Sequence, residues 1–380
     1  MHPADRVNNI QEYYFSRKMR EIQELLAKGK PVVNLGIGNP DLPPPASVIQ
    51  ALLEASSDLS KQGYQPYKGL PEFREAIASF YKKHYKVSLD YNSEILPLAG
   101  AKEGIMHISM AYLNKDDAVL IPNPGYSSYT TVTKMLGATP VLYDLKAENN
   151  WQPDINALEK LDLSKVKIIW VNYPNMPTGA KASISLFKKL ISFTQKHDIL
   201  LVNDNPYSFI LNENPISVFS EIGMTDSVLE LNSLSKSFNM AGWRVGMLVG
   251  SKQHIDNVLK IKSNMDSGMF YGLQKGAIAA LHVKKQWFNE LNNIYKTRRN
   301  LIWKIADKLA CTYEKEANGF FVWAKLPDKQ NDMEISNQLL SEQHIFVTPG
   351  SIFGNNGNGH LRFSLCVDEK VLNEILGRIS

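Results

Sequence analysis

Seven short apolar runs, rich in residues that favour β-strands, recur between residues 95 and 250 of this 380-residue chain. Several are nearly continuous, such as KIIWVN and ILLVND, and continuous runs are typical of strands covered on both faces. Helical patterns lie between many of them: Ile105, Ile108 and Tyr112 share one helical face, and another helix is expected after a Ser185 cap. The alternation predicts an α/β fold with a mainly parallel seven-stranded sheet and flanking helices, with strands at 95–99, 118–121, 140–144, 166–172, 199–202, 227–231 and 245–249.

The pattern changes after residue 250. A long helical pattern covers 287–309, and it is followed by the expected strand GFFVWAKLP, a helix near 334–343 and the expected strand HLRFSL. This order indicates a smaller α+β domain. The first 45 residues contain a helix and the proline-rich stretch NPDLPPP. We therefore expect an N-terminal segment (1–46) packed on the smaller domain, a large domain (47–250) and a small C-terminal domain (251–380).

Composition and charge exclude several classes of protein. Hydrophobic residues make up 44% and charged residues 21%, which is ordinary for a globular protein, and the formal charge of +4 is not concentrated in a basic block. Nucleic-acid binding is therefore not expected. The two cysteines, Cys311 and Cys366, show no zinc or disulfide spacing, so no metal site is expected. No run is long enough to cross a membrane and no secretory signal is recognisable, so we expect a cytoplasmic protein without a membrane partner.

The most informative stretch is ELNSLSKSFNMAGWRVG at 230–246. Lys236 follows an expected strand and lies among small hydroxyl residues. A single lysine is usually a solvated surface residue, but an amine held in a covered place has a lowered pKa and becomes a nucleophile. The hydroxyl groups of Ser233 and Ser235, together with Arg244, could hold a phosphate near this amine.

This stretch resembles the lysine motif of fold-type I pyridoxal-phosphate enzymes, and specifically that of class I and II aminotransferases. The resemblance covers nearly the whole chain in the family's order, through LGIGNPD at 35–41, YQPYKGLPEFREAIA at 64–78, AGAKEGI at 99–105, PNPGYSSY at 122–129, NYPNMPTG at 172–179, VNDNPY at 202–207 and HLRFSL at 360–365. It implies a pyridoxal 5′-phosphate cofactor attached to Lys236. It also implies ping-pong transfer of an amino group between an L-amino acid and a 2-oxo acid, and a homodimer with shared active sites.

Four further cofactor contacts follow from the motifs. AGAKEGI lies where a strand becomes a helix, so the free N–H groups around Ala101 and Lys102 suit a phosphate. By resemblance, the ring of Tyr126 stacks on the cofactor. Asp204 ends an apolar strand, where an acid is costly unless it is paired; by resemblance it pairs with the cofactor's ring nitrogen. The resemblance also makes Tyr207 a donor to the cofactor's ring oxygen.

Four residues are assigned to substrate or to the subunit interface. Arg362 lies between apolar strand residues and can grip a carboxylate with two parallel hydrogen bonds. By resemblance it holds the substrate's α-carboxylate, whereas an ion pair that only stabilises the fold is the structural alternative. Gly38 resembles the glycine that leaves room for substrate, and Tyr13 is assigned to an N-terminal clamp. Tyr64 resembles the tyrosine that reaches the partner subunit's cofactor phosphate.

One position departs from the family's pattern. The family usually has asparagine immediately before Pro-Thr-Gly, where its amide donates to the cofactor's ring oxygen, but this chain has Met176. Methionine cannot donate a hydrogen bond. Either Asn172 or Asn175 takes over, or Tyr207 acts alone.

Other functions share the same motifs. A carbon–sulfur lyase or a decarboxylase of the same fold type would use the same lysine, aspartate and tyrosine. A regulatory protein with an aminotransferase-like domain usually has a DNA-binding module first, and we do not expect one because only about 35 residues precede LGIGNPD.

The substrate's side chain is open at this stage. Apolar residues that could line its subsite are Phe15, Ile37, Met176, Met269, Phe270 and Tyr271. No second arginine is assignable to a distal carboxylate, for which Lys102 and Lys262 are the candidates. The segment KSNMDSGMF at 262–270 resembles the branch that includes alanine and diaminopimelate aminotransferases.

Overall fold

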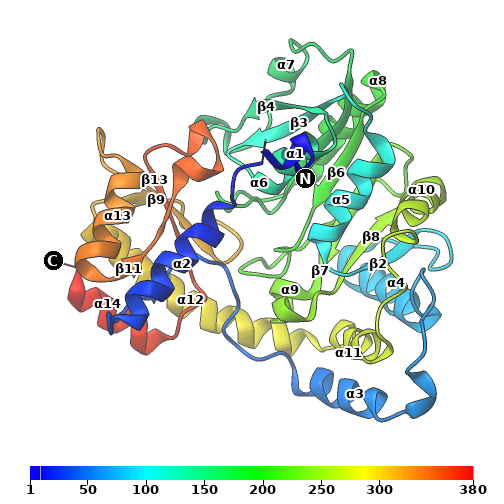
Figure 1. Cartoon of the computed structure of the whole chain (residues 1–380), viewed down its shortest axis with the longest axis horizontal. Helices are drawn as coiled ribbons and strands as arrows, with labels where there is room; N and C mark the ends of the chain where they lie inside the picture. The colour runs from blue at the N-terminus through cyan, green and yellow to red at the C-terminus, as the bar shows by residue number, and fades with distance from the viewer. Residues whose placement is uncertain (9, 380) are drawn as a thin grey trace.

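A seven-stranded sheet forms the centre of the larger part of the molecule (Figure 1). The computed structural model describes residues 1–8 and 10–379. In spatial order the strands are β2 (Ile95–Leu98), β8 (Gly246–Gly250), β7 (Val228–Ser233), β6 (Leu200–Asp204), β5 (Val166–Val171), β3 (Ala118–Asn123) and β4 (Thr139–Asp144). Only β8 runs against its neighbours, so the predicted mainly parallel sheet is confirmed. β5 and β6, the strands of KIIWVN and ILLVND, are almost fully buried as predicted, whereas β4 is an edge strand and is largely uncovered.

Helices cover both faces of this sheet. One face packs against α4 (Pro71–Tyr85), α8 (Ile184–His197) and α11 (Tyr271–Leu281). The other packs against α5 (Ala101–Tyr112), α6 (Ser127–Met135) and α10 (Lys252–Lys262). The expected Ser185 cap is wrong, because the extended residue Ser183 precedes α8 and its hydroxyl oxygen accepts the N–H of Leu186 at 3.1 Å. Ser185 itself lies inside the first helical turn.

The smaller part has an antiparallel sheet. Its order is β12 (Thr348–Pro349), β13 (His360–Ser364), β10 (Phe321–Lys325) and β9 (Thr312–Tyr313). The helices α12 (Lys285–Lys308), α13 (Asp332–Gln343) and α14 (Glu369–Arg378) pack around it. The predicted long helix and both predicted strands are therefore present. The remaining short elements are α1 (Asp5–Asn8), α3 (Ala46–Ser56), α7 (Ile155–Leu158), α9 (Leu234–Ser237), η1 (Leu59–Lys61), η2 (Ala147–Asn149), η3 (Ala241–Trp243), η4 (Gly350–Phe353) and η5 (Asn355–Gly357).

The N-terminal segment lies on the smaller part. In α2 (Tyr14–Ala27), Ile22 packs with Leu340 and Phe346. β1 (Val33–Asn34) then pairs in parallel with β11 (Ile345–Phe346). Apolar burial on one helix face and a short strand pairing thus fix the direction of the chain as it approaches Gly36.

The predicted division at residues 46 and 250 stays a prediction. Helices α10 and α11 both lie after residue 250, yet they bury their apolar faces against the large sheet. Phe288, at the start of α12, joins the same cluster as α11. The hydrophobic core of the larger part therefore extends beyond the predicted boundary, because after α3 the chain returns to the smaller part only along α12.

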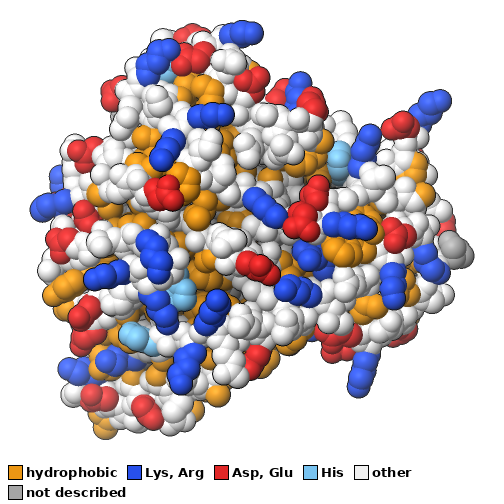
Figure 2. Space-filling model, turned by 180° about the vertical axis from the view of Figure 1, so that it is seen from behind, with side chains coloured by type: hydrophobic (Ala, Val, Ile, Leu, Met, Phe, Trp, Pro, Cys, Tyr) orange, Lys and Arg blue, Asp and Glu red, His pale blue; other side chains and the backbone are white. Residues whose placement is uncertain are grey.

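The surface carries both signs of charge. Figure 2 shows Lys, Arg, Asp and Glu side chains mixed over one face of the molecule. Within residues 1–8 and 10–379, no helix is long and apolar enough to cross a membrane. The same residues contain no His, Cys, Asp and Glu cluster suited to a metal ion. Cys311 and Cys366 are both free and buried.

Candidate active site

The functional motifs meet at one edge of the large sheet. The parallel strands β2, β3, β5, β6 and β7 all end there, and the antiparallel strand β8 begins there (Figure 1). In open α/β sheets this edge is where ligands bind. Motifs of the larger part that lie far apart in the sequence are therefore brought together because each follows or precedes a neighbouring strand. LGIGNPD and HLRFSL reach the same pocket from the smaller part, after β1 and on β13.

A pocket of about 1220 Å³ opens at this edge. All the predicted site residues except Tyr64 line it, namely Tyr13, Gly38, Ala101, Lys102, Tyr126, Asp204, Tyr207, Ser233, Ser235, Lys236, Arg244 and Arg362. Tyr64 is 92% exposed and lies outside the pocket. Whether Tyr64 reaches the pocket of a second subunit stays a prediction.

Lys236 is presented by the short helix α9. The side chain of Ser233 caps this helix by accepting the N–H of Ser235 at 3.1 Å. The Nζ atom of Lys236 donates to the backbone carbonyl of Gly38 at 2.7 Å and lies 5.4 Å from the centre of the Phe320 ring. Burial lowers the pKa of Lys236 to about 8, because water no longer stabilises the charged form. At pH 7 about a tenth of this amine is thus neutral and nucleophilic, far more than for an exposed lysine.

Asp204 carries an unsatisfied oxygen into the pocket. Its Oδ2 accepts the hydroxyl proton of Tyr129 at 2.8 Å, but its buried Oδ1 has no hydrogen-bond partner among the described residues. Burial raises the pKa of Asp204 to about 6. A buried carboxylate with one free oxygen is suited to a cationic partner, such as a protonated ring nitrogen.

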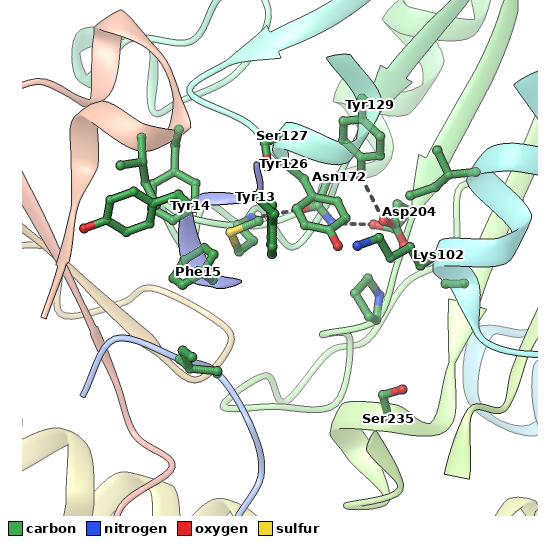
Figure 3. Close-up of a pocket in the computed structure, with 18 of the residues that line it drawn as sticks. Tyr13, Tyr14, Phe15, Lys102, Tyr126, Ser127, Tyr129, Asn172, Asp204 and Ser235 are labelled. Carbon is green, nitrogen blue, oxygen red and sulfur yellow. Dashed lines mark hydrogen bonds between the residues drawn. The ribbon is translucent and has the colours of Figure 1, made fainter. Parts of the chain in front are cut away.

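Tyr129 was missed by the sequence analysis. Its ring stacks on Trp170 with a centroid distance of 4.8 Å and an interplanar angle of 7°, so its hydroxyl group is rigidly aimed at Asp204 (Figure 3). The available signal was its spacing: Tyr129 follows Tyr126, the residue just before α6, by three residues, and their rings are in edge-on contact with centroids 5.6 Å apart.

An anion cradle lies where β2 passes into α5. Gly100 has a φ of +93°, and a Cβ atom there would collide with the guanidinium group of Arg244. That guanidinium group therefore lies against the first turn of α5, where the N–H groups of Ala101 and Lys102 have no acceptor among the described residues, whereas that of Glu103 donates to the Gly100 carbonyl at 3.2 Å. The hydroxyl groups of Ser233 and Ser235 are joined by a 2.9 Å hydrogen bond beside it. Free N–H groups, an arginine and two hydroxyl groups suit a phosphate.

Arg362 lies in an aromatic cage. Its guanidinium carbon is 4.0 Å from the centre of the Phe321 ring and 4.7 Å from that of Phe353. Nη2 donates to the Gly36 carbonyl at 2.6 Å, whereas the buried Nε has no partner among the described residues. Burial lowers the pKa of Arg362 to about 10. Buried donors without a full set of acceptors are suited to an incoming carboxylate.

Tyr13, Tyr126 and Lys102 surround the same space from different segments (Figure 3). The Nζ atom of Lys102 lies 5.0 Å from the centre of the Tyr13 ring, so the N-terminal segment contacts the start of α5. Tyr207 also lines the pocket; its side chain is buried, with its ring edge-on to that of Phe320.

Met176 occupies the position expected to hold asparagine. Its sulfur lies 3.1 Å from Nη1 of Arg362. Of the proposed substitutes, Asn175 is bonded within its own turn through Thr178 and does not line the pocket. Asn172 does line the pocket, although its amide already donates to the Asp204 carbonyl and accepts the N–H of Met176.

Several expected substrate contacts are absent from this pocket. Phe15, Ile37 and Met176 line it, as predicted. The expectation for Met269, Phe270 and Tyr271 is wrong for the pocket of this chain, because they lie at the start of α11, which packs toward α3 and α4. Lys262 is also outside, since its amine is bound by Asp266 at 2.6 Å.

Comparison with known proteins gives a consistent picture. Residues 30–379 match the family model for aminotransferases of class I and II. The LL-diaminopimelate aminotransferase of Aquifex aeolicus is 36% identical over 99% of this chain and 98% of its own length. The corresponding enzyme of Halothermothrix orenii is 37% identical over 100% and 98%.

Solved structures agree with this result. BacF from Bacillus subtilis, in its apo form, superposes with a TM-score of 0.94 at 36% identity, over 100% of this chain and 97% of BacF. An aminotransferase from Staphylococcus aureus gives a TM-score of 0.88 at 30% identity, over 99% of this chain and 98% of the other. Since sequence motifs, fold and full-length similarity all agree, we conclude that the chain belongs to the class I and II aminotransferases and is an enzyme of amino-group transfer.

Proposed function

We propose that the pocket binds pyridoxal 5′-phosphate, with Lys236 as its covalent attachment point. The observation that carries this proposal is the meeting of a largely enclosed, partly neutral lysine with the unpaired oxygen of Asp204 in one pocket. Asp204 would face the cofactor's ring nitrogen, and Tyr126 would cover the ring. Arg244, Ser235 and the first turn of α5 would hold the phosphate.

Each group of the chain that surrounds the pocket then has a separate chemical role. The bound cofactor supplies an aldehyde for amines and a ring that withdraws electrons. Arg362 fixes the substrate's carboxylate and so places the Cα–H bond within reach of Lys236. Lys236, once free, takes the proton from Cα as a general base; its pKa of about 8 is close to working pH. The aromatic side chains around Arg362 exclude water, which strengthens each of these charge interactions.

We propose an amino donor with an apolar side chain. The apolar and aromatic side chains that line the pocket together with Arg362 include those of Tyr13, Phe15, Met19, Ile37, Ile352 and Phe353. Such a wall favours apolar side chains. Two curated relatives are named LL-diaminopimelate aminotransferases, whose named substrate carries charges at its far end. Charged side chains that also line the pocket include those of Glu12, Arg17 and Lys102, and all three are exposed to water.

A panel of donors tests the function. Purified enzyme loaded with pyridoxal 5′-phosphate should lose its visible absorbance when mixed with L-phenylalanine, L-leucine or L-methionine, and regain it with 2-oxoglutarate. LL-diaminopimelate should react more slowly, because the charged side chains of Glu12, Arg17 and Lys102 are exposed and would pair only weakly with its distal charges. Release of ammonia, a thiol or carbon dioxide without dependence on a 2-oxo acid would instead show a lyase or a decarboxylase. A faster reaction with LL-diaminopimelate would overturn the apolar donor class.

We further propose a homodimer in which Tyr64 completes the partner's site. Exposed apolar side chains gather on two segments that touch, since a Cβ atom at Gly268 would collide with the carbonyl of Gln65. They are Leu59, Tyr64, Tyr67, Met265 and Phe270. An exposed apolar patch of this kind is typical of a protein interface.

Subunit mixing tests the shared site. Lys236→Ala and Tyr64→Ala subunits should each be nearly inactive alone. Co-purified hybrid dimers should regain activity, because one of their two sites then contains both native residues. Light scattering at the mass of one chain, or hybrids as inactive as the parents, would exclude the arrangement.

A further inference from the structure

The segment Gly36–Asp41 forms one wall of the pocket and contacts both principal side chains of the proposed chemistry. The carbonyl of Gly36 accepts from Nη2 of Arg362 at 2.6 Å. Two residues later, the carbonyl of Gly38 accepts from Nζ of Lys236 at 2.7 Å. The position of this short backbone segment therefore determines where both side chains point.

Close packing fixes the N-terminal end of the segment. The carbonyl of Leu35 accepts the N–H of Ser364 at 2.7 Å, and the carbonyl of Gly36 also accepts the hydroxyl of Thr348 at 2.7 Å. A Cβ atom at Gly38 would collide with the Phe321 ring, so glycine is required for this approach. From Gly38 onward, this strand-like pairing stops.

An arginine fixes the other end. Arg298, on α12, is almost completely buried and donates from Nη1 and Nη2 to the two carboxylate oxygens of Asp41 at 2.7 and 2.9 Å. Its Nη1 also donates to the carbonyl of Leu365 at 3.2 Å, and its Nε donates to Glu369 at 3.1 Å. The guanidinium group thus joins the segment to α12 and to α14.

We propose that Arg298 is a positioning residue, which through its two-pronged contact with Asp41 holds the segment Gly36–Asp41 in place against Arg362 and Lys236. A planar guanidinium group that makes two parallel hydrogen bonds sets the orientation of its partner as well as its distance. An error of about 1 Å in the placement of a reacting group can cost about 10²-fold in rate. This inference rests on the proposed roles of Arg362 and Lys236.

The second acidic partner of Arg298, Glu369, provides a matched control for a test of this role. Asp41 and Glu369 both pair with Arg298, and their side chains are 31% and 35% exposed. Each can be neutralised without a change of shape, by Asp41→Asn and by Glu369→Gln. Only Asp41 belongs to the segment that touches the pocket, so a positioning role predicts that only Asp41→Asn weakens carboxylate binding. If the ion pairs of Arg298 only stabilise the fold, both variants should bind the carboxylate equally well.

The measurement is carboxylate binding to the loaded enzyme by calorimetry, with 3-phenylpropanoate, hexanoate and glutarate as probes. These acids lack an amino group and cannot react. For the probe that binds wild type best, Asp41→Asn should raise the dissociation constant at least about tenfold, and Glu369→Gln should leave it within about twofold. Thermal unfolding should show similar losses of stability for both. Arg362→Leu removes the carboxylate subsite, so its dissociation constant gives the weakest binding expected in this series.

The outcomes separate this inference from the proposed function. Equal effects of Asp41→Asn and Glu369→Gln on binding would overturn the role of Arg298, even while wild type still transfers amino groups. Binding of the probes to Arg362→Leu as tightly as to wild type would overturn the carboxylate subsite itself. Arg298→Lys keeps the positive charge but cannot make two parallel hydrogen bonds to Asp41. Its dissociation constant for the probe should therefore be as high as that of Asp41→Asn. A dissociation constant equal to that of wild type would show that the charge alone is sufficient and would overturn the positioning role of the guanidinium group.

Discussion

Replacement of Lys236 by alanine is expected to lower the rate of amino transfer by at least about 10⁴-fold. The variant loses both the amine that attaches the cofactor and the base that takes the proton from the substrate's Cα. Spectra of the purified protein should also lack the visible band that arises when a lysine amine condenses with the cofactor's aldehyde. The prediction thus has a static readout as well as a kinetic one.

Lys181→Ala is the control for this experiment. Lys181 is an exposed residue whose amine lies 3.3 Å from Glu316, and its loss should leave turnover and spectrum unchanged. Added methylamine should restore part of the turnover of Lys236→Ala, because a free amine can take over the proton transfer. Wild-type turnover in Lys236→Ala would end the proposed mechanism.

The second large effect is expected for Asp204→Asn, which should reduce turnover by about 10³-fold. Asparagine keeps the shape and can still accept the hydrogen bond from Tyr129. It cannot, however, neutralise a protonated ring nitrogen. Cofactor affinity should fall together with turnover, which equilibrium dialysis would measure; turnover within tenfold of wild type would contradict the role of Asp204.

Without cofactor, the same substitution should stabilise the protein in a pH-dependent way. The pKa of Asp204 is raised to about 6 by burial, against about 3.9 in an unfolded chain. Between these values the folded protein holds a proton that the unfolded chain has lost, so the free energy of unfolding falls as pH rises from about 4 to 6. The difference of about two units corresponds to about 3 kcal/mol.

Asparagine is neutral throughout, so cofactor-free Asp204→Asn should match wild type at pH 4 and be about 3 kcal/mol more stable at pH 7. Urea unfolding at several pH values measures this difference. The control is Asp256→Asn, which makes the same change at a partly exposed residue paired with Lys252, outside the pocket. If the free energy of unfolding varied with pH in the same way for wild type and Asp204→Asn, burial would not raise the pKa of Asp204.

The strand ends explain why so much of the site was predictable from the sequence. Asp204 and Lys236 each follow an apolar run that had to be a buried strand, and neighbouring parallel strands end at the same edge. Once the sheet is recognised, the two residues must lie close together. The resemblance to a family added the chemical roles, which strand order alone does not supply.

Residues that act from outside this edge were not predictable in the same way. Arg298 and Asp41 are 257 positions apart, and neither lies at the end of a sheet strand, so no local pattern pairs them. Lys262 was a reasonable candidate by charge, but a carboxylate one helical turn away, Asp266, binds its amine. Both cases depend on which side chains meet in three dimensions, which periodicity does not encode.

The helix α12 links the two hydrophobic clusters of the molecule (Figure 1). Phe288 near its beginning belongs to the cluster of the larger part, and Ile302 about three-quarters of the way along it belongs to that of the smaller part. An uninterrupted α-helix is stiff along its length, because every turn is closed by backbone hydrogen bonds. Any rotation of one part against the other must therefore bend this helix or shift it within one of the two packed clusters, so the free energy of opening the pocket includes the cost of disturbing that packing.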